Sequence, residues 1–160
     1  MGLDMYLYKR TYIGAGHEWS KNTAKLEVFH GEDKVQLSIG QIEYIIEEAG
    51  YWRKAYPIHR WFVKNVKGGV DIEADFHVSL DKLRELLVPV NRILEVFREK
   101  GEEGVSALTD DSLFPIQDID LDPYYIETLE RTRDMIEGIL TENENRKDGF
   151  WVDYYYSSSF

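Results

Sequence analysis

A strand pattern near each end of the chain is the feature that most constrains its fold. Residues 3–8 (LDMYLY) alternate between apolar positions and more polar ones, which is the period of a strand with one buried face. Residues 150–156 (FWVDYYY) are mostly aromatic or β-branched, as strands favour. Helical spacing dominates between these segments. This order indicates an α+β fold with a mainly antiparallel sheet, and we expect the first and last strands to share that sheet.

The spacing of apolar residues predicts about four helices packed on the sheet. They cover residues 38–48, 57–67, 80–97 and 123–141, and two further short strands are expected at residues 24–30 and 74–78. Pro57 suits the first position of the second helix, and Ser79 is a good N-cap for the third. Pro89 should kink or split that third helix. Because the 160 residues contain no repeat and no low-complexity linker, we expect a single domain over residues 1–160.

No acidic residue occurs between Glu48 and Asp71, although the whole chain has a net charge of −11. Basic and aromatic side chains are interleaved in this window. The candidate ligand-binding residues there are Trp52, Arg53, Lys54, His59, Arg60 and Trp61. Indole rings can stack on a planar ligand while guanidinium and ammonium groups pair with its charge. Arg53 and Lys54 also precede the expected helix start, where free backbone N–H groups and the helix dipole favour an anion.

Part of this window also has a purely structural interpretation. A helix that begins at Pro57 would place Arg60, Lys64 and Lys67 on one narrow face, which suits a solvated surface that neutralises nearby acidic residues. His59 would turn toward the apolar face, where a histidine commonly hydrogen-bonds a neighbouring group. A proton-carrying or ligand-stacking role for His59 remains the alternative.

Residues 154–160 (YYYSSSF) add hydroxyl groups to the candidate site. Tyr154, Tyr156 and Ser157 are expected to close the pocket with neutral hydrogen bonds to a sugar or a base. Asp4 and Asp153 would form a carboxylate pair suited to acid–base chemistry if their strands were neighbours at those positions.

Composition excludes several classes of protein. The chain has no cysteine, which rules out disulfides, thiolate metal sites and cysteine nucleophiles. The four histidines lack the spacing of a zinc site, and no phosphate-binding loop or hydrolase motif is present. We therefore assign no catalytic residue and expect no metal and no cofactor.

Since there is no recognisable signal peptide and no apolar run of membrane-spanning length, we expect a cytoplasmic protein without a membrane partner.

The charge is unevenly distributed along the chain. Residues 101–160 hold 15 acidic and four basic side chains. This acidic part disfavours binding to duplex nucleic acid, whose phosphates it would repel. It is typical of a solvated surface, and the alternative is a surface that captures a basic host protein.

Three segments together resemble a known family. They are MGLDMYLYKR (residues 1–10), GYWRKAYPIHRWFVKN (residues 50–65) and YYYSSSF (residues 154–160). The family consists of small uncharacterised proteins encoded mainly by bacteriophages and their bacterial hosts. Its middle segment usually reads close to GYWRKANAIHRWFV, so Tyr56-Pro57 replaces an Asn-Ala dipeptide here. The resemblance spans about the whole chain in order, and it implies a phage-associated protein of the host cytoplasm without implying any catalytic activity.

Three functions are compatible with these observations. The preferred one is a non-enzymatic binder of a small anionic aromatic ligand, nucleotide-like, which in a phage setting would sequester a host immune signalling nucleotide. The second is an inhibitor that captures a host protein through the acidic C-terminal surface. The third is an enzyme that acts on a phosphorylated substrate, with His59 as proton carrier. Because such binders often use a subunit interface, a homodimer or higher homo-oligomer is also expected.

Overall fold

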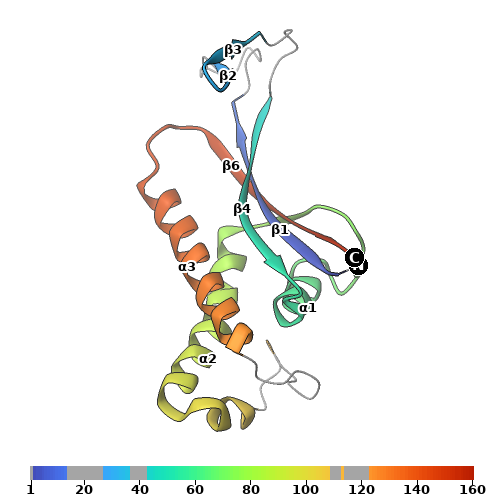
Figure 1. Cartoon of the computed structure of the whole chain (residues 1–160), viewed down its shortest axis with the longest axis vertical. Coiled ribbons are helices and arrows are strands. Elements are labelled where there is room, and N and C mark those ends of the chain that lie inside the picture. The colour runs from blue at the N-terminus through green and yellow to red at the C-terminus, as the bar shows by residue number, and fades with distance from the viewer. Residues whose placement is uncertain (1, 14–26, 37–42, 109–112, 114–122) are drawn as a thin grey trace.

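The computed structural model describes residues 2–13, 27–36, 43–108, 113 and 123–160. Within these residues the chain forms six strands and three helices (Figure 1). The strands are β1 (Asp4–Tyr12), β2 (Val28–His30), β3 (Asp33–Val35), β4 (Tyr44–Arg53), β5 (Phe76–Val78) and β6 (Trp151–Ser159). The helices are α1 (Tyr56–Asn65), α2 (Leu80–Ser106) and α3 (Pro123–Asn145). The α+β class is confirmed, with one helix fewer than expected in the described part of the chain.

Four of the strands form one antiparallel sheet in the order β4-β1-β6-β5. β1 and β6 are its two central strands, which confirms that the first and last strands share a sheet. Their register places Asp4 opposite Ser159 and Arg10 opposite Asp153. Asp4 and Asp153 are therefore six positions apart along the pair, about 20 Å at the rise of a strand. The carboxylate pair considered from the sequence does not form.

Residues 44–48 belong to β4, so the helix expected over residues 38–48 is wrong where the structure describes it. Residues 38–42 lie outside the described residues. A short isoleucine-rich run fits either a helix or a strand, and the pairing of β4 along the length of β1 decides the outcome. Leu7 faces Gly50 while Tyr8 faces Glu48, so Ala49 is an extra residue that forms a bulge in β4.

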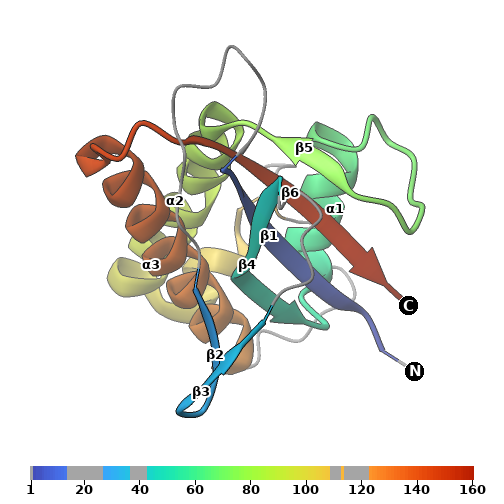
Figure 2. The same ribbon diagram turned by 90° about the horizontal axis from the view of Figure 1, so that it is seen from above.

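One face of the sheet carries the core. Met5 and Leu7 of β1 and Tyr154 and Tyr156 of β6 are buried there, and all three helices add buried residues to the same cluster. Phe62 of α1 stacks on Tyr156, with 4.0 Å between ring centroids and 7° between ring planes. Figure 2 shows α2 and α3 packed side by side next to the sheet.

The sequence signals at the helix ends are partly confirmed. Pro57 lies in the first turn of α1, and the Ser79 side chain caps α2 by accepting a hydrogen bond from the backbone N–H of Lys82 at 3.2 Å. α2 extends to Ser106, beyond the end expected from the sequence. Its backbone departs from helical angles at Gly101, where φ is 64°, and not at Pro89. Glycine adopts such a positive φ without steric cost, so the break falls there.

The short strands are also confirmed within the described residues. β2 and β3 form a two-stranded hairpin, which in Figure 1 lies at the far end of the molecule from α1 and α2. β2 covers the last three residues of the strand expected over residues 24–30. β5 covers residues 76–78 of the strand expected over residues 74–78 and pairs with β6 at the edge of the sheet.

Candidate functional site

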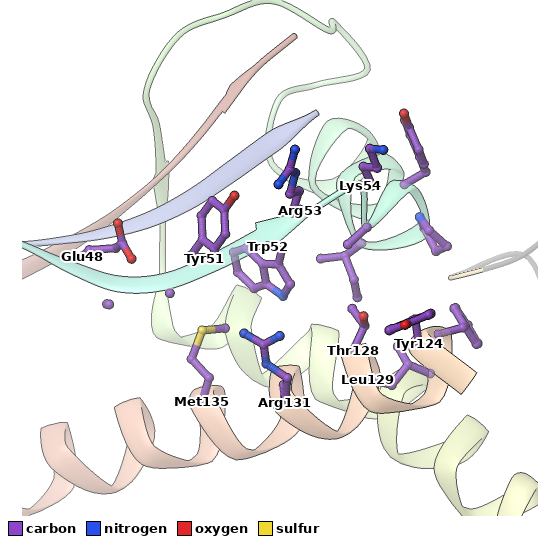
Figure 3. Close-up of a pocket in the computed structure, with 17 residues that line it drawn as sticks. Glu48, Tyr51, Trp52, Arg53, Lys54, Tyr124, Thr128, Leu129, Arg131 and Met135 are labelled. Atoms are coloured by element: carbon purple, nitrogen blue, oxygen red, sulfur yellow. The ribbon is translucent and has the colours of Figure 1, made fainter. Parts of the chain in front are cut away.

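A cavity of about 1350 Å³ lies between the end of β4, the start of α1 and α3 (Figure 3). Residues 48–58 form one wall. The other wall is formed by Tyr124, Tyr125, Thr128, Leu129, Arg131 and Met135 of α3. This volume is large enough for a nucleotide-sized ligand. The end of β4 and the start of α1, which lie in the segment without acidic residues between Glu48 and Asp71, thus face α3, a helix that is distant in the sequence.

Five aromatic residues line the cavity: Tyr51, Trp52, Tyr56, Tyr124 and Tyr125. The Tyr51 ring itself packs on Tyr6 on the opposite face of the sheet and its hydroxyl donates to Asp4. Trp52 and Tyr125 are buried, whereas Tyr56 is 49% exposed and Tyr124 is 73% exposed. Exposed rings at the edge of a cavity are available to stack on a planar ligand. Tyr56 and Tyr124 therefore offer the stacking surface that the sequence suggested for the two tryptophans.

The charged residues of the lining are mainly basic. Arg53, Lys54 and Arg131 line the cavity together with one acidic residue, Glu48. In Figure 3 the Arg131 side chain points from α3 toward β4, while Arg53 and Lys54 lie at the end of β4 on the side away from α3. The Arg53 side chain is 68% exposed, and its Nε lies 4.0 Å from Asp4. Arg131 is therefore the cation that faces the cavity, and Arg53 and Lys54 add positive charge at its rim.

The first turns of α1 and α3 both border this cavity. Neither first turn contains an acidic residue, and Ala55, the N-cap of α1, provides no side-chain cap. Backbone N–H groups and the positive end of the helix dipole favour anions at such positions. The backbone at these helix starts and the basic side chains thus both favour an anionic ligand in the cavity.

The junction between β4 and α1 depends on an unusual backbone conformation of Lys54. Its φ is 55°, in the left-handed region, which costs a non-glycine residue roughly 1 kcal/mol. Two backbone hydrogen bonds hold the junction, from Lys54 N to the Leu3 carbonyl at 2.8 Å and from Tyr56 N to the Lys54 carbonyl at 2.9 Å. The chain therefore changes from strand to helix within two residues and curves around the cavity.

Trp52 borders the cavity as part of the core. It is 5% exposed, its Nε1 donates a hydrogen bond to Thr132 Oγ1 at 2.8 Å, and its ring tilts against Phe62. Near it, burial raises the pKa of the Tyr125 phenol, and the positive charge of Arg60 partly opposes that rise. Arg60 is exposed and is close enough to influence the cavity, although it is not part of the lining.

His59 belongs to a separate, buried network. It is 5% exposed, and its two ring nitrogens bond Tyr156 Oη at 2.7 Å and Asp71 Oδ2 at 2.9 Å. Lys67, 4% exposed, donates to Asp71 Oδ1 at 3.1 Å, to the Ile72 carbonyl at 2.6 Å and to Ser158 Oγ at 3.2 Å. This engages all three hydrogens of the ammonium group. We refer to His59, Lys67, Tyr156 and Ser158, with Asp71 at their solvent-exposed edge, as the buried network.

Two pKa shifts reflect this arrangement. Burial acts to raise the pKa of Asp71, but hydrogen bonds and charge from His59 and Lys67 outweigh it and lower that pKa below its usual value. Burial raises the pKa of the Tyr156 phenol, partly opposed by a hydrogen bond with Ser158. Asp71 is thus held as a carboxylate and Tyr156 as a neutral phenol at neutral pH.

The structure brings only some of the sequence-predicted residues to the cavity. Trp52, Arg53 and Lys54 line it, and Arg60 lies near it. The other predicted residues are not among the lining: His59, Trp61, Tyr154, Tyr156 and Ser157. Trp61 and Tyr154 are buried in the core, and Tyr154 Oη accepts a hydrogen bond from Asn143 of α3 at 2.8 Å. The tail therefore does not close this cavity.

Lys67 also departs from its expected place. The sequence pattern predicts that it shares the solvated face of a helix with Arg60 and Lys64, but α1 ends at Asn65. Helical spacing does not apply beyond that residue, and the Lys67 side chain turns into the core instead.

Sequence reasoning missed the α3 side of the cavity. Tyr124, Thr128, Arg131 and Met135 are spaced three or four residues apart, so they share one face of a helix. That periodicity was present in the sequence. Nothing local indicated that this face lies opposite residues 48–58.

No protein-family model, curated protein or solved structure matches this chain. Among the described residues, no helix has both the length and the apolar character needed to cross a membrane. The same residues contain no group of three or more histidine, aspartate or glutamate side chains placed to hold a metal ion. The functional argument therefore depends on the geometry of the site.

Proposed function

We propose that this protein binds a small anionic aromatic ligand, of the nucleotide class, in the cavity between β4, α1 and α3. The observation that carries the proposal is the composition of the lining, with three basic residues and one acidic residue in a chain whose net charge is −11. Five aromatic residues accompany them. Charge pairing and ring stacking act on different parts of such a ligand, so both contribute to its affinity.

The ligand would contact both walls of the cavity. Its anionic group would lie near Arg131 and the first turns of α1 and α3, with Arg53 and Lys54 at the rim. Its ring would stack on Tyr56 or Tyr124, whose side chains are exposed. Thr128 adds a hydroxyl group to the wall formed by α3.

The proposed role is binding without chemistry. His59, the residue considered as a proton carrier, is not part of the lining, and both of its ring nitrogens are engaged in the buried network. Together with the resemblance to phage and prophage proteins, this favours sequestration of a host signalling nucleotide in the cytoplasm over its conversion.

The test is calorimetric titration and thermal shift with a panel of ATP, cyclic dinucleotides and ADP-ribose. A panel member should bind, raise the melting temperature and be recovered unchanged by chromatography. Arg131→Ala should weaken binding about tenfold or more, since a charge-assisted contact contributes roughly 1.5–3 kcal/mol. Arg53→Ala should also weaken binding while leaving the melting temperature of the free protein nearly unchanged, because its side chain is mostly exposed.

Lys64→Ala is the matched control, because Lys64 is an exposed cation of α1 that does not line the cavity. If it weakened binding as much as Arg131→Ala, the effect would be one of general charge and the proposed site would be wrong. Turnover of the bound ligand would overturn the non-enzymatic role.

A second candidate function rests on α3. Glu127, Glu130, Asp134 and Glu137 are exposed on this helix, and this acidic surface would capture a basic host protein. A complex with a host protein that survives Arg131→Ala but is lost on charge reversal of these four residues would support this inhibitor over the nucleotide binder.

A further inference from the structure

The face of the sheet opposite the core is rich in aromatic residues. Directly opposite residues in an antiparallel sheet share a face, and the register aligns Tyr44 of β4, Tyr12 of β1 and Trp151 of β6 in one row. The next row contains Ile46, Arg10 and Asp153, and the row after it contains Glu48, Tyr8 and Tyr155. We call this the outer face. All three helices pack against the other side of the sheet.

The outer face already binds one cation of the protein itself. The Arg10 guanidinium lies 3.9 Å from the centre of the Tyr155 ring, and its NH2 group pairs with Asp75 Oδ2 at 2.5 Å. A ring below and a carboxylate at the side form a favourable site for a planar guanidinium. The outer face can therefore hold a guanidinium group between an aromatic ring and a carboxylate.

Trp151 and Asp153 repeat that combination one row away. Trp151 is 71% exposed, and its Nε1 donates to Asp153 Oδ2 at 3.0 Å, so the ring and the carboxylate are held next to each other. His77 Nε2 lies 3.4 Å from the other oxygen of Asp153. Among the described residues, the cation–ring contacts involve Arg10 and Lys67, and neither lies on Trp151. Tyr44 and Ile46, also exposed, extend this surface across β4.

By the register the outer face carries the carboxylates of Asp4, Glu48 and Asp153, with Asp75 beside Arg10, and two basic residues, Arg10 and Arg53, so its charge is acidic on balance. Burial, the neighbouring Tyr6, and the charges of Glu48 and Asp75 together raise the pKa of Tyr8. A hydrogen bond to Asp4 is the main reason that the pKa of Tyr51 is raised. An acidic surface repels phosphate, so single-stranded nucleic acid is a poor occupant despite the rings. Complementarity favours a cationic partner instead.

We propose that the outer face docks an arginine-rich segment of a partner protein, with one arginine stacked on Trp151 and paired with Asp153. Tyr12, Tyr44 and Ile46 would pack against the stem of that side chain and its neighbours. Tyrosine, tryptophan and arginine are the residues that contribute most to binding at protein interfaces. The site is independent of the nucleotide-class cavity, because Trp151 and Asp153 are not among the residues that line it.

The test measures the anisotropy of fluorescein-labelled hexa-arginine and hexa-lysine peptides titrated with the whole protein. Hexa-arginine should bind several-fold more tightly than hexa-lysine, because a guanidinium stacks on an indole better than an ammonium group does. Trp151→Ala should weaken hexa-arginine binding about fivefold and abolish the preference over hexa-lysine. Asp153→Asn should weaken binding of both peptides.

Two controls separate this site from general attraction to an acidic protein. Glu137→Gln removes an exposed charge from α3, and Phe29→Ala removes an exposed ring from β2. Both should leave hexa-arginine binding within about twofold of the original protein. Equal losses for Glu137→Gln and Asp153→Asn, equal affinities for the two peptides, or no binding at all would each overturn the proposal. Because Trp151 is largely exposed, its truncation should leave the circular dichroism spectrum unchanged.

Discussion

At the scale of single residues, Lys67 ties the segment after α1 to β6 through one buried ammonium group. It bonds Asp71 and Ile72 in the segment after α1 and Ser158 in β6. Lys67→Met keeps most of the volume but leaves Asp71 and Ser158 without their cationic partner. We expect a loss of roughly 2–3 kcal/mol in the free energy of unfolding, measured by urea denaturation. Lys64→Met, an exposed control on α1, should change it by less than about 0.5 kcal/mol. Similar losses for both variants would contradict a structural role for Lys67.

Asp71 makes the buried network sensitive to acid. Its pKa in the folded protein is lowered below the unfolded value, so its contribution to stability is present above about pH 4 and is lost as the pH falls through the folded pKa. The free energy of unfolding should exceed that of Asp71→Asn by a constant amount between about pH 5 and pH 7, and this difference should shrink below about pH 4. Urea denaturation at several pH values tests this. A difference that stays constant down to about pH 3 would show that Asp71 does not act through its charge.

At the scale of elements, the approach of α3 to β4 depends on Gly50. A Cβ at that position would lie 2.1 Å from Sδ of Met135. Gly50→Ala should therefore lower the free energy of unfolding by about 1 kcal/mol, the low end of the cost of overpacking, because the flexible Met135 side chain can turn aside. The cost should be smaller in a Met135→Ala background, and a double-mutant cycle measures that coupling. An equal cost in both backgrounds would mean that the contact does not determine the approach.

Gly138 provides the contrasting case on α3. A Cβ there would meet no atom within 4 Å. Gly138→Ala should raise the free energy of unfolding by about 0.5–1 kcal/mol, because alanine favours a helix interior more than glycine does. Thermal and urea denaturation should both show the gain. A loss of stability would indicate that this face of α3 is less open than the structure has it.

The elements that could be predicted from the sequence are those with local signals. The alternation in β1, the proline at the start of α1 and the Ser79 cap each depend on neighbouring residues. β4 could not be predicted in this way, since its strand conformation follows from pairing with β1 some 40 positions earlier. The cavity shows the same limit. Arg53 and Lys54 stood out by composition, but Arg131 lies 77 positions further along the chain and joins them only in the folded protein.

At the scale of the whole molecule, the central pair of the sheet joins β1 to β6. Every other described element lies between these strands in the sequence. The central strand pair therefore joins residues that are far apart along the chain, and we expect the fold to form slowly. The last residues of β6 belong to this central strand pair. Ser157, Ser158 and Ser159 pair with Tyr6, Met5 and Asp4 of β1. The Phe160 ring packs edge-on against the His59 ring, with 5.7 Å between the ring centroids.

Deletion of residues 157–160 should therefore abolish cooperative unfolding. It removes three rows of the central strand pair together with Ser158, an acceptor for the buried ammonium group of Lys67. Deletion of Phe160 alone, which is 52% exposed, should leave a cooperative transition of only slightly lower midpoint. Circular dichroism during thermal unfolding distinguishes the two variants. If the four-residue deletion kept a sharp transition near that of the full chain, the end of β6 would be dispensable for the cooperative fold.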